Sequence, residues 1–152
     1  MLEDIESAQG ELQRADHMIY VTLKYTRTGD VIKNIVERLV GSMNYTITDM
    51  LEYAKSKNKL KEVPASDIAK LELLNTVLKP LFAKNKALKE QIDLYMVLKR
   101  VSKMPFTVRE EYRKNVTLIT TETEIDTSTV IAYYGLVKEF FIFSRTWMNE
   151  IK

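Results

Sequence analysis

Hydrophobic residues recur along most of this 152-residue chain at the spacing of one face of a helix. Between residues 2 and 26 they fall at Leu2, Ile5, Ala8, Leu12, Ala15, Ile19 and Leu23. Between residues 30 and 57 they fall at Ile32, Ile35, Val36, Leu39, Met43, Ile47, Met50, Leu51 and Ala54. Because a helix repeats every 3.6 residues, each stretch predicts a long amphipathic helix. The short break around Gly29 predicts that these two helices form an antiparallel hairpin.

The middle of the chain predicts a third helix that a proline interrupts. Ser66 is a suitable N-cap for it, because its hydroxyl can accept a hydrogen bond from the first turn. Pro80 falls inside the apolar pattern, where it removes a backbone donor and crowds the preceding turn. We therefore expect a kink or break between Lys79 and Asn85. The helical pattern then resumes at Leu88, Ile92, Tyr95, Leu98 and Val101.

The last third of the chain carries mixed signals. Thr107 and Glu110 have the spacing of a capping box, which predicts a helix from Thr107 to about Ile119. Residues 116–130 are rich in Thr, Val and Ile, whose branched side chains favour extended chain. Residues 120–127 are therefore predicted to form a loop or a short hairpin, followed by a final helix over 128–151. The pattern as a whole predicts an all-α, up-and-down helical bundle of five to six helices in a single domain, residues 1–152.

Composition removes several classes of chemistry. The chain has no Cys and one His, which excludes disulfides, thiol catalysis, Cys-zinc sites and a site with two His ligands to a metal. We expect neither a metal nor another cofactor. The net charge of +2 predicts no strong overall attraction to nucleic acid. The N-terminus is acidic and no apolar run approaches the ~18 residues of a membrane span, which predicts a cytoplasmic protein without a membrane segment.

Only a few residues are candidates for catalysis or phosphate binding. His17 is the single side chain that titrates near neutral pH, and catalysis by it would need a carboxylate from another helix. The alternative is a histidine that only packs its ring. Two groups of lysines could contact phosphates, or could simply keep a loop and a helix face hydrated. These groups are Lys55, Lys57, Lys59 and Lys61, and Lys79, Lys84, Lys86 and Lys89.

Aromatic residues concentrate in the final predicted helix. Tyr133, Phe140, Phe143 and Trp147 fall within one sector of it, beside a second apolar sector. One sector can pack inside the bundle, and a second copy of the chain is the simplest cover for the other. We therefore predict a homodimer with these four residues at its interface. The alternative is a helix that lies wholly inside the single chain.

The segment Arg109-Glu110-Glu111-Tyr112-Arg113-Lys114-Asn115-Val116, together with the long opening hairpin, resembles the HEPN superfamily. Members are small all-α domains, commonly dimeric, and many are metal-independent RNases or components of toxin–antitoxin pairs. Their signature is an Arg, four to six residues and then a His on a late helix. Here five residues follow Arg109, and Asn115 stands in the place of the histidine.

The replacement of the histidine changes what the resemblance implies. Asn115 forms hydrogen bonds but does not titrate near neutral pH, whereas Arg109 can hold a phosphate. The resemblance thus implies a degenerate site that binds RNA or a nucleotide through Arg109, Arg113 and Lys114 without cleaving it. The hypothesis is a non-enzymatic bundle that acts through homodimerisation and through a protein partner or RNA. The alternative is a metal-independent RNase that uses Arg109 with Asn115 or with His17.

Overall fold

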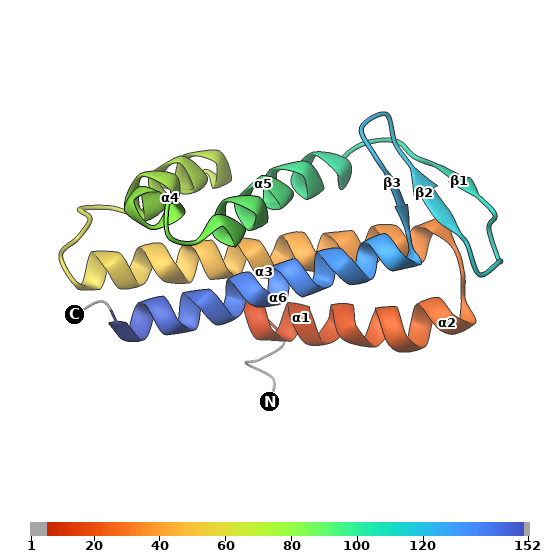
Figure 1. Ribbon diagram of the computed structural model, residues 1–152, viewed down its shortest axis with the longest axis horizontal. Coiled ribbons are helices and arrows are strands. Elements are labelled where there is room, and N and C mark those ends of the chain that lie inside the picture. Colours follow the sequence, from red (N-terminus) through yellow and green to blue (C-terminus); the bar gives the residue numbers. More distant parts are fainter. Residues whose placement is uncertain (1–5, 151–152) are drawn as a thin grey trace.

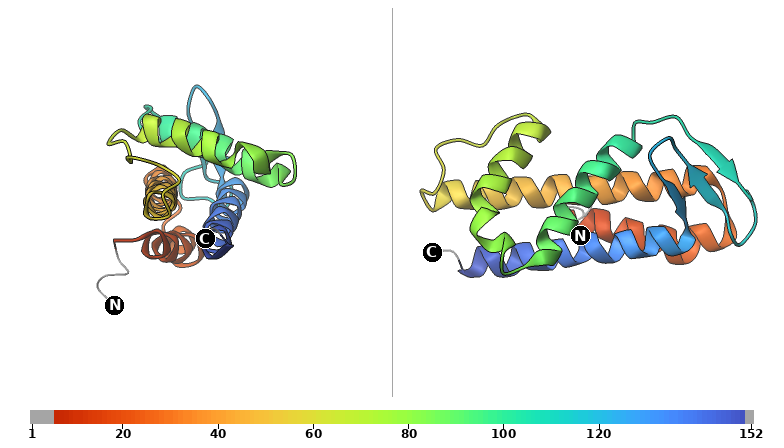
Figure 2. Two further views of the ribbon diagram at one scale, coloured as in Figure 1. Left: turned by 90° about the vertical axis from the view of Figure 1, so that its left-hand side faces the viewer. Right: turned by 45° about the horizontal axis from the view of Figure 1, so that its top comes forward.

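Helix α3 (Gly29–Ser56) is the central element of the computed structural model, which describes residues 6–150. It packs against α1 (Ala8–His17) and against α6 (Thr127–Glu150), and α1 runs antiparallel to it as predicted (Figure 1). Seen end-on, the three helices form a triangle (Figure 2). Their facing apolar side chains, which include Leu12, Leu39 and Val137, make up the centre of the core.

The first helix contains a wide turn that the periodicity did not predict. The Ser7 hydroxyl caps α1 by accepting a hydrogen bond from the Gly10 N–H at 3.0 Å. The chain then continues without a break through a π-helical turn, Met18–Thr22, and the short helix α2, Leu23–Tyr25. The predicted apolar positions Leu2 and Ile5 lie outside the described residues.

Two shorter helices, α4 (Asp67–Phe82) and α5 (Lys86–Val101), cross the side of this three-helix bundle that α3 and α6 form (Figure 2). The predicted cap is confirmed, because the Ser66 hydroxyl accepts from the Ala69 N–H at 3.0 Å. The predicted break is confirmed too. Pro80 lies in the last turn of α4, and α5 begins only after the Asn85 side chain has capped a new first turn.

The helix predicted from Thr107 to Ile119 is wrong. Three short strands form an antiparallel sheet in the order β1-β2-β3 at one end of the molecule (Figure 1). They are β1 (Thr107–Arg109), β2 (Thr117–Ile119) and β3 (Glu124–Asp126). Val108, Leu118 and Ile125 pair across the sheet and share one face, where Leu118 and Ile125 are buried. Burial of this face outweighs the local capping pattern, which stabilises a helix only modestly.

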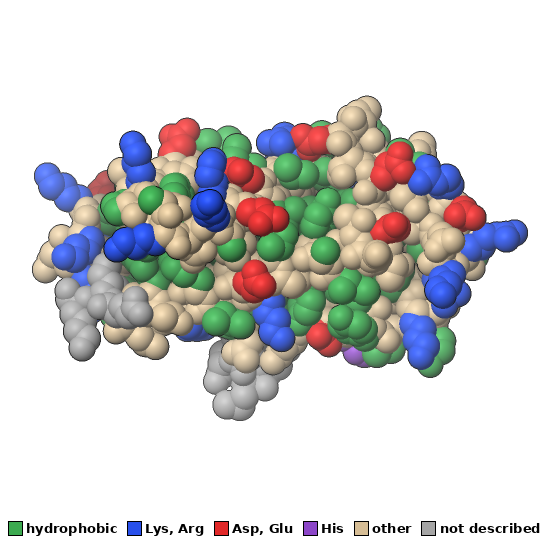
Figure 3. Space-filling model, in the orientation of Figure 1, with side chains coloured by type: hydrophobic (Ala, Val, Ile, Leu, Met, Phe, Trp, Pro, Cys, Tyr) green, Lys and Arg blue, Asp and Glu red, His purple; other side chains and the backbone are tan. Residues whose placement is uncertain are grey.

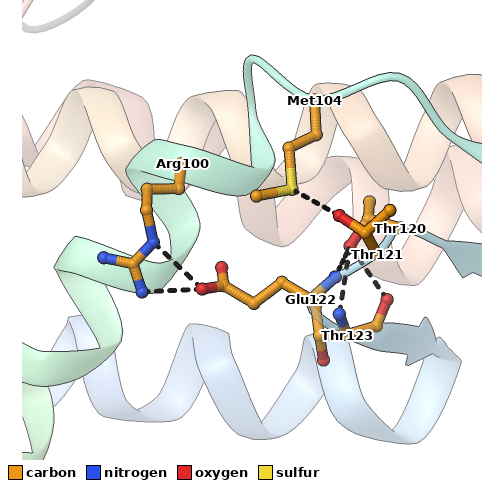
Figure 4. Close-up of polar contacts among 6 residues, drawn as sticks. All are labelled: Arg100, Met104, Thr120, Thr121, Glu122 and Thr123. Atoms are coloured by element: carbon orange, nitrogen blue, oxygen red, sulfur yellow. Dashed lines mark hydrogen bonds and ion pairs between the residues drawn. The ribbon is translucent and has the colours of Figure 1, made fainter.

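The short hairpin predicted as one alternative for residues 120–127 is confirmed by the antiparallel pairing of β2 and β3. In its turn, the Thr120 hydroxyl accepts hydrogen bonds from the Glu122 and Thr123 N–H groups (Figure 4). Nε and Nη2 of Arg100 both donate to Oε1 of Glu122, at 3.0 and 2.8 Å. This contact ties the hairpin turn to the C-terminal end of α5 (Figure 4).

The bundle is therefore helical with a small sheet, and it is not all-α. Within residues 6–150 there are five helices when the π-turn and α2 are counted as the continuation of α1. The strict up-and-down order is wrong as well, because α3 and α6 run in the same direction (Figure 1). The segment between them, made of α4, α5 and the sheet, returns the chain to the end at which α3 begins.

Gly29 permits the close approach of β1 to the first turn of α3. A Cβ atom at this position would lie 2.3 Å from Cγ2 of Val108 and 3.1 Å from Cε2 of Phe106. We expect Gly29→Ala to lower the free energy of unfolding by about 1–3 kcal/mol in urea denaturation, as overpacking does. Gly135→Ala is the matched control, because nothing lies within 4 Å of its Cβ position. It should leave stability unchanged or raise it by up to about 1 kcal/mol. Equal stability of the two variants would contradict this packing of β1.

Candidate nucleic-acid interface

Two tyrosines stand in solvent at the end of the molecule that carries the sheet. Tyr25 is 79% exposed and Tyr112 is 74% exposed. Tyr25 ends α2, and Tyr112 lies in the loop between β1 and β2. A backbone hydrogen bond joins the two segments, since the Tyr112 N–H donates to the Arg27 carbonyl oxygen at 2.6 Å. The segments that carry the two rings are therefore adjacent at this end of the molecule.

The β1–β2 loop is held against the start of α3 by a second contact. Oε2 of Glu111 accepts a hydrogen bond at 3.2 Å from the Gly29 N–H, which has no acceptor within the helix. A carboxylate at this position also lies favourably in the field of the helix N-terminus. The Thr28 hydroxyl caps the same turn by accepting from the Val31 N–H. Residues 82 positions apart in sequence thus fix the conformation of the loop.

The loop carries backbone strain that the tethers maintain. Glu110 and Tyr112 have φ angles of 55° and 69°, in the left-handed region that residues other than glycine rarely adopt. Such conformations cost about 1–3 kcal/mol each and persist only where surrounding contacts enforce them. Here the hydrogen bonds to Arg27 and Gly29 supply that enforcement. The Tyr112 ring is thereby held out in solvent instead of joining the core.

Basic side chains flank both rings. The Lys24 ammonium lies 5.9 Å from the centroid of the Tyr25 ring. Arg113 and Lys114 follow Tyr112 directly and are exposed. Arg27, Arg113 and Lys114 form no ion pair with any other residue between 6 and 150. We call this surface the aromatic–basic end; its members are Lys24, Tyr25, Arg27, Tyr112, Arg113 and Lys114.

Arg109 lies on strand β1 and is already paired. Its Nη2 atom lies 2.7 Å from Oε1 of Glu124 on β3, and both side chains are exposed. The hydrogen bond and the charge of Glu124 raise the pKa of Arg109, which therefore remains a cation. A phosphate at Arg109 would have to share the guanidinium with this carboxylate. The other two predicted phosphate contacts, Arg113 and Lys114, form no ion pair with an acidic side chain in the described part of the chain.

The structure does not bring the predicted catalytic candidates together. Asn115 lies in the β1–β2 loop, so neither it nor Arg109 stands on a late helix. His17 ends α1 and is exposed, and its imidazole has no hydrogen bond or ion pair with any described residue. No contact of this kind links it to Arg109 or Asn115.

The aromatic residues of α6 lie at different depths. Phe140 is completely buried and belongs to the core of the single chain. Its ring stacks on that of Phe143 with centroids 6.4 Å apart. Tyr133, Phe143 and Trp147 are half-buried and pack against the core. Phe140 therefore has no surface to offer a partner, and Ile142 is the large apolar residue of α6 that is exposed.

The predicted lysine run lies at the other end of the molecule. Lys55, Lys59 and Lys61 line a surface cavity of about 530 Å³ at the C-terminus of α3. At 1.5 Å per residue, the 28 residues of α3 place it about 40 Å from the aromatic–basic end. Cations here offset the negative end of the helix dipole. Figure 3 shows Lys and Arg side chains mostly toward the two ends of the molecule, with acidic and apolar side chains between them.

Sequence reasoning missed the two tyrosines. Few aromatic residues lie beside the lysine runs in the sequence. The available signal was the alternation of aromatic and basic residues in Lys24-Tyr25-Thr26-Arg27 and Tyr112-Arg113-Lys114. That signal does not reveal exposure, because the two segments meet only in the folded chain.

Comparisons with known proteins assign this chain neither a family nor a function. No family model matches this sequence, and neither a curated protein nor a solved structure matches it.

Within the described residues, no group of three or more His, Cys, Asp and Glu side chains is placed to hold a metal ion. Among helices in the same part of the chain, none combines the length and the apolar character needed to cross a membrane.

A tyrosine between α1 and α6 provides a pH-dependent test of the packing near His17. The Tyr134 hydroxyl donates to Oδ2 of Asp16 at 3.0 Å, and burial together with this bond raises the Tyr134 pKa to about 12. An unfolded tyrosine titrates near pH 10, so the folded state holds this proton more tightly. The stabilisation from this group is complete below pH 10 and is lost as the pH rises from about 10 to about 12.

We expect Tyr134→Phe to remove part of the alkaline fall in the free energy of unfolding, measured by urea denaturation between pH 8 and 12. Tyr133→Phe is the matched control, since the Tyr133 hydroxyl has no hydrogen bond within residues 6–150. That variant should retain the full alkaline fall. The same slope in both variants would contradict the contact between Tyr134 and Asp16.

Proposed function

We propose that this chain is a non-catalytic protein that binds single-stranded RNA at its aromatic–basic end. The supporting observation is that Tyr25 and Tyr112, both largely exposed, lie on adjoining segments flanked by unpaired cations. Aromatic rings stack unpaired bases, and Lys and Arg side chains bind phosphates. Proteins that bind single strands combine these two elements, each of which is present on this surface.

Charge and base accessibility favour single strands over a duplex. Duplex recognition depends on many phosphate contacts, and the chain has a net charge of only +2. The aromatic–basic end offers four cations: Lys24, Arg27, Arg113 and Lys114. Bases in a single strand are free to stack on tyrosine, whereas those in a duplex already stack on each other. If all four cations contact phosphates, the slope of log K against log salt is about −3.

The chemistry of the same region favours binding without cleavage. Arg109 is engaged by Glu124, and Asn115 cannot transfer a proton near neutral pH. A metal-independent RNase remains the alternative function, with Arg109 and either Asn115 or His17. Incubation of labelled single-stranded RNA with the protein in EDTA separates the two. The proposal expects intact RNA, and cleavage that Arg109→Ala abolishes would favour the alternative.

Homodimerisation is a separate part of the proposal. The half-buried positions Phe143 and Trp147 leave part of each ring available to a second copy, whereas Phe140 does not. Sedimentation velocity over a range of concentrations tests this part. A single monomeric species at high micromolar concentration would remove it, and the RNA-binding proposal would stand.

Replacing Tyr112 by glycine separates RNA binding from stability. Tyr112→Gly removes the ring and relieves the strain of φ 69°, while the backbone donor to Arg27 remains. We expect stability to be unchanged or higher by about 1 kcal/mol. We expect affinity for fluorescein-labelled oligouridylate, measured by anisotropy, to fall roughly tenfold through lost stacking.

Tyr45→Ala is the control for the loss of a tyrosine elsewhere, because Tyr45 is exposed on α3 outside the aromatic–basic end. It should bind the oligonucleotide like the parent protein. Equal affinity of the parent and Tyr112→Gly, or equal loss in Tyr45→Ala, would refute the proposed site.

A further inference from the structure

A groove lies between helices α4 and α5, away from the aromatic–basic end. Its volume is about 420 Å³, within the range of pockets that hold small molecules. One face of each helix lines the groove. The lining residues are Asp67, Ile68, Leu71, Glu72 and Asn75 from α4, and Tyr95, Met96, Lys99, Arg100 and Lys103 from α5 and the turn after it.

The middle of the groove is apolar and incompletely covered. Leu71 and Tyr95 are buried residues of its lining. Ile68 and Met96 stand on its two walls and are 68% and 42% exposed. Two large apolar side chains facing one groove in water can gain stabilisation from an apolar ligand. A methionine wall suits a flexible chain, because the thioether side chain adapts its shape.

The polar groups of the groove are unevenly distributed. Three cations, Lys99, Arg100 and Lys103, lie at its end near the N-terminus of α4. Lys99 is paired with Asp67, and Arg100 is paired with Glu122 of the hairpin turn (Figure 4). Lys103 has no ion pair or side-chain hydrogen bond to any residue of the described chain. Its ammonium is therefore the cation in this lining that is available to an anion.

We infer that this groove binds an amphiphile with one apolar chain and one carboxylate, such as a medium-chain fatty acid. The tail lies against Ile68, Leu71 and Met96, and the carboxylate pairs with Lys103. The asymmetry of the groove matches the asymmetry of such a ligand, with an apolar middle and a free cation at one end only. Glu72 lines the same groove and opposes the head group electrostatically, so its removal should strengthen binding.

The test uses the full chain labelled with ¹³C at the methionine methyl groups and titrated with sodium laurate below its critical micelle concentration. The Met96 methyl resonance should shift and saturate, whereas that of Met43, which is buried in the core, should not. Calorimetry gives the affinity. We expect dodecanol, which has the same chain and no charge, to bind more weakly than laurate.

Variants locate both ends of the ligand. Ile68→Asp should abolish laurate binding, and its exposed position allows the chain to fold. Lys103→Gln should weaken binding about fivefold, as expected for one exposed ion pair, and Glu72→Gln should strengthen it. Ile142→Asp and Lys138→Gln, on α6, are the matched controls and should bind like the parent. No saturable shift at Met96, equal binding of dodecanol, or equal loss in the α6 controls would overturn the inference.

Discussion

The burial of α3 is the constraint on which the other elements depend. Half of the 28 residues of this helix are buried, and they face α1, α6, α5 and the sheet in turn. No single neighbour can cover a helix on so many sides, so α1, α6, the crossing pair α4 and α5, and the small sheet all pack around it. The exposed aromatic and basic side chains discussed above lie at the two ends of α3. The sheet and its loop close the N-terminal end, and lysines follow the C-terminal end.

The parts of this fold that local pattern determines could be predicted from the sequence. Apolar spacing located the helices, Ser66 marked the start of α4, and Pro80 marked the break before α5. The sheet was not predictable in this way, because the helix signal of Thr107 and Glu110 is local. The signal that prevails is long-range, namely the burial of Leu118 and Ile125 against the helices. The direction of α6 likewise depends on how the intervening 70 residues fold.

The candidate site was only partly visible in the sequence for the same physical reason. Arg113 and Lys114 were identified by residue type, and their exposure agrees with a role in binding. Tyr112 was not identified, because its exposure depends on a positive φ angle enforced by contacts with residues 27 and 29. Arg109 could be identified but its partner could not, because Glu124 reaches it across β2. Long-range contacts thus determine which charges are free and which rings face solvent.

The central claim is that single-stranded RNA contacts the end of the molecule where the β1–β2 loop meets the start of α3. Photo-crosslinking of a 4-thiouridine oligonucleotide to the full chain, followed by mass spectrometry of the peptides, tests this location most directly. The account predicts crosslinked peptides that contain Tyr25 or Tyr112, the exposed rings of that end. Crosslinks confined to residues 55–61, at the opposite end of α3, would contradict it.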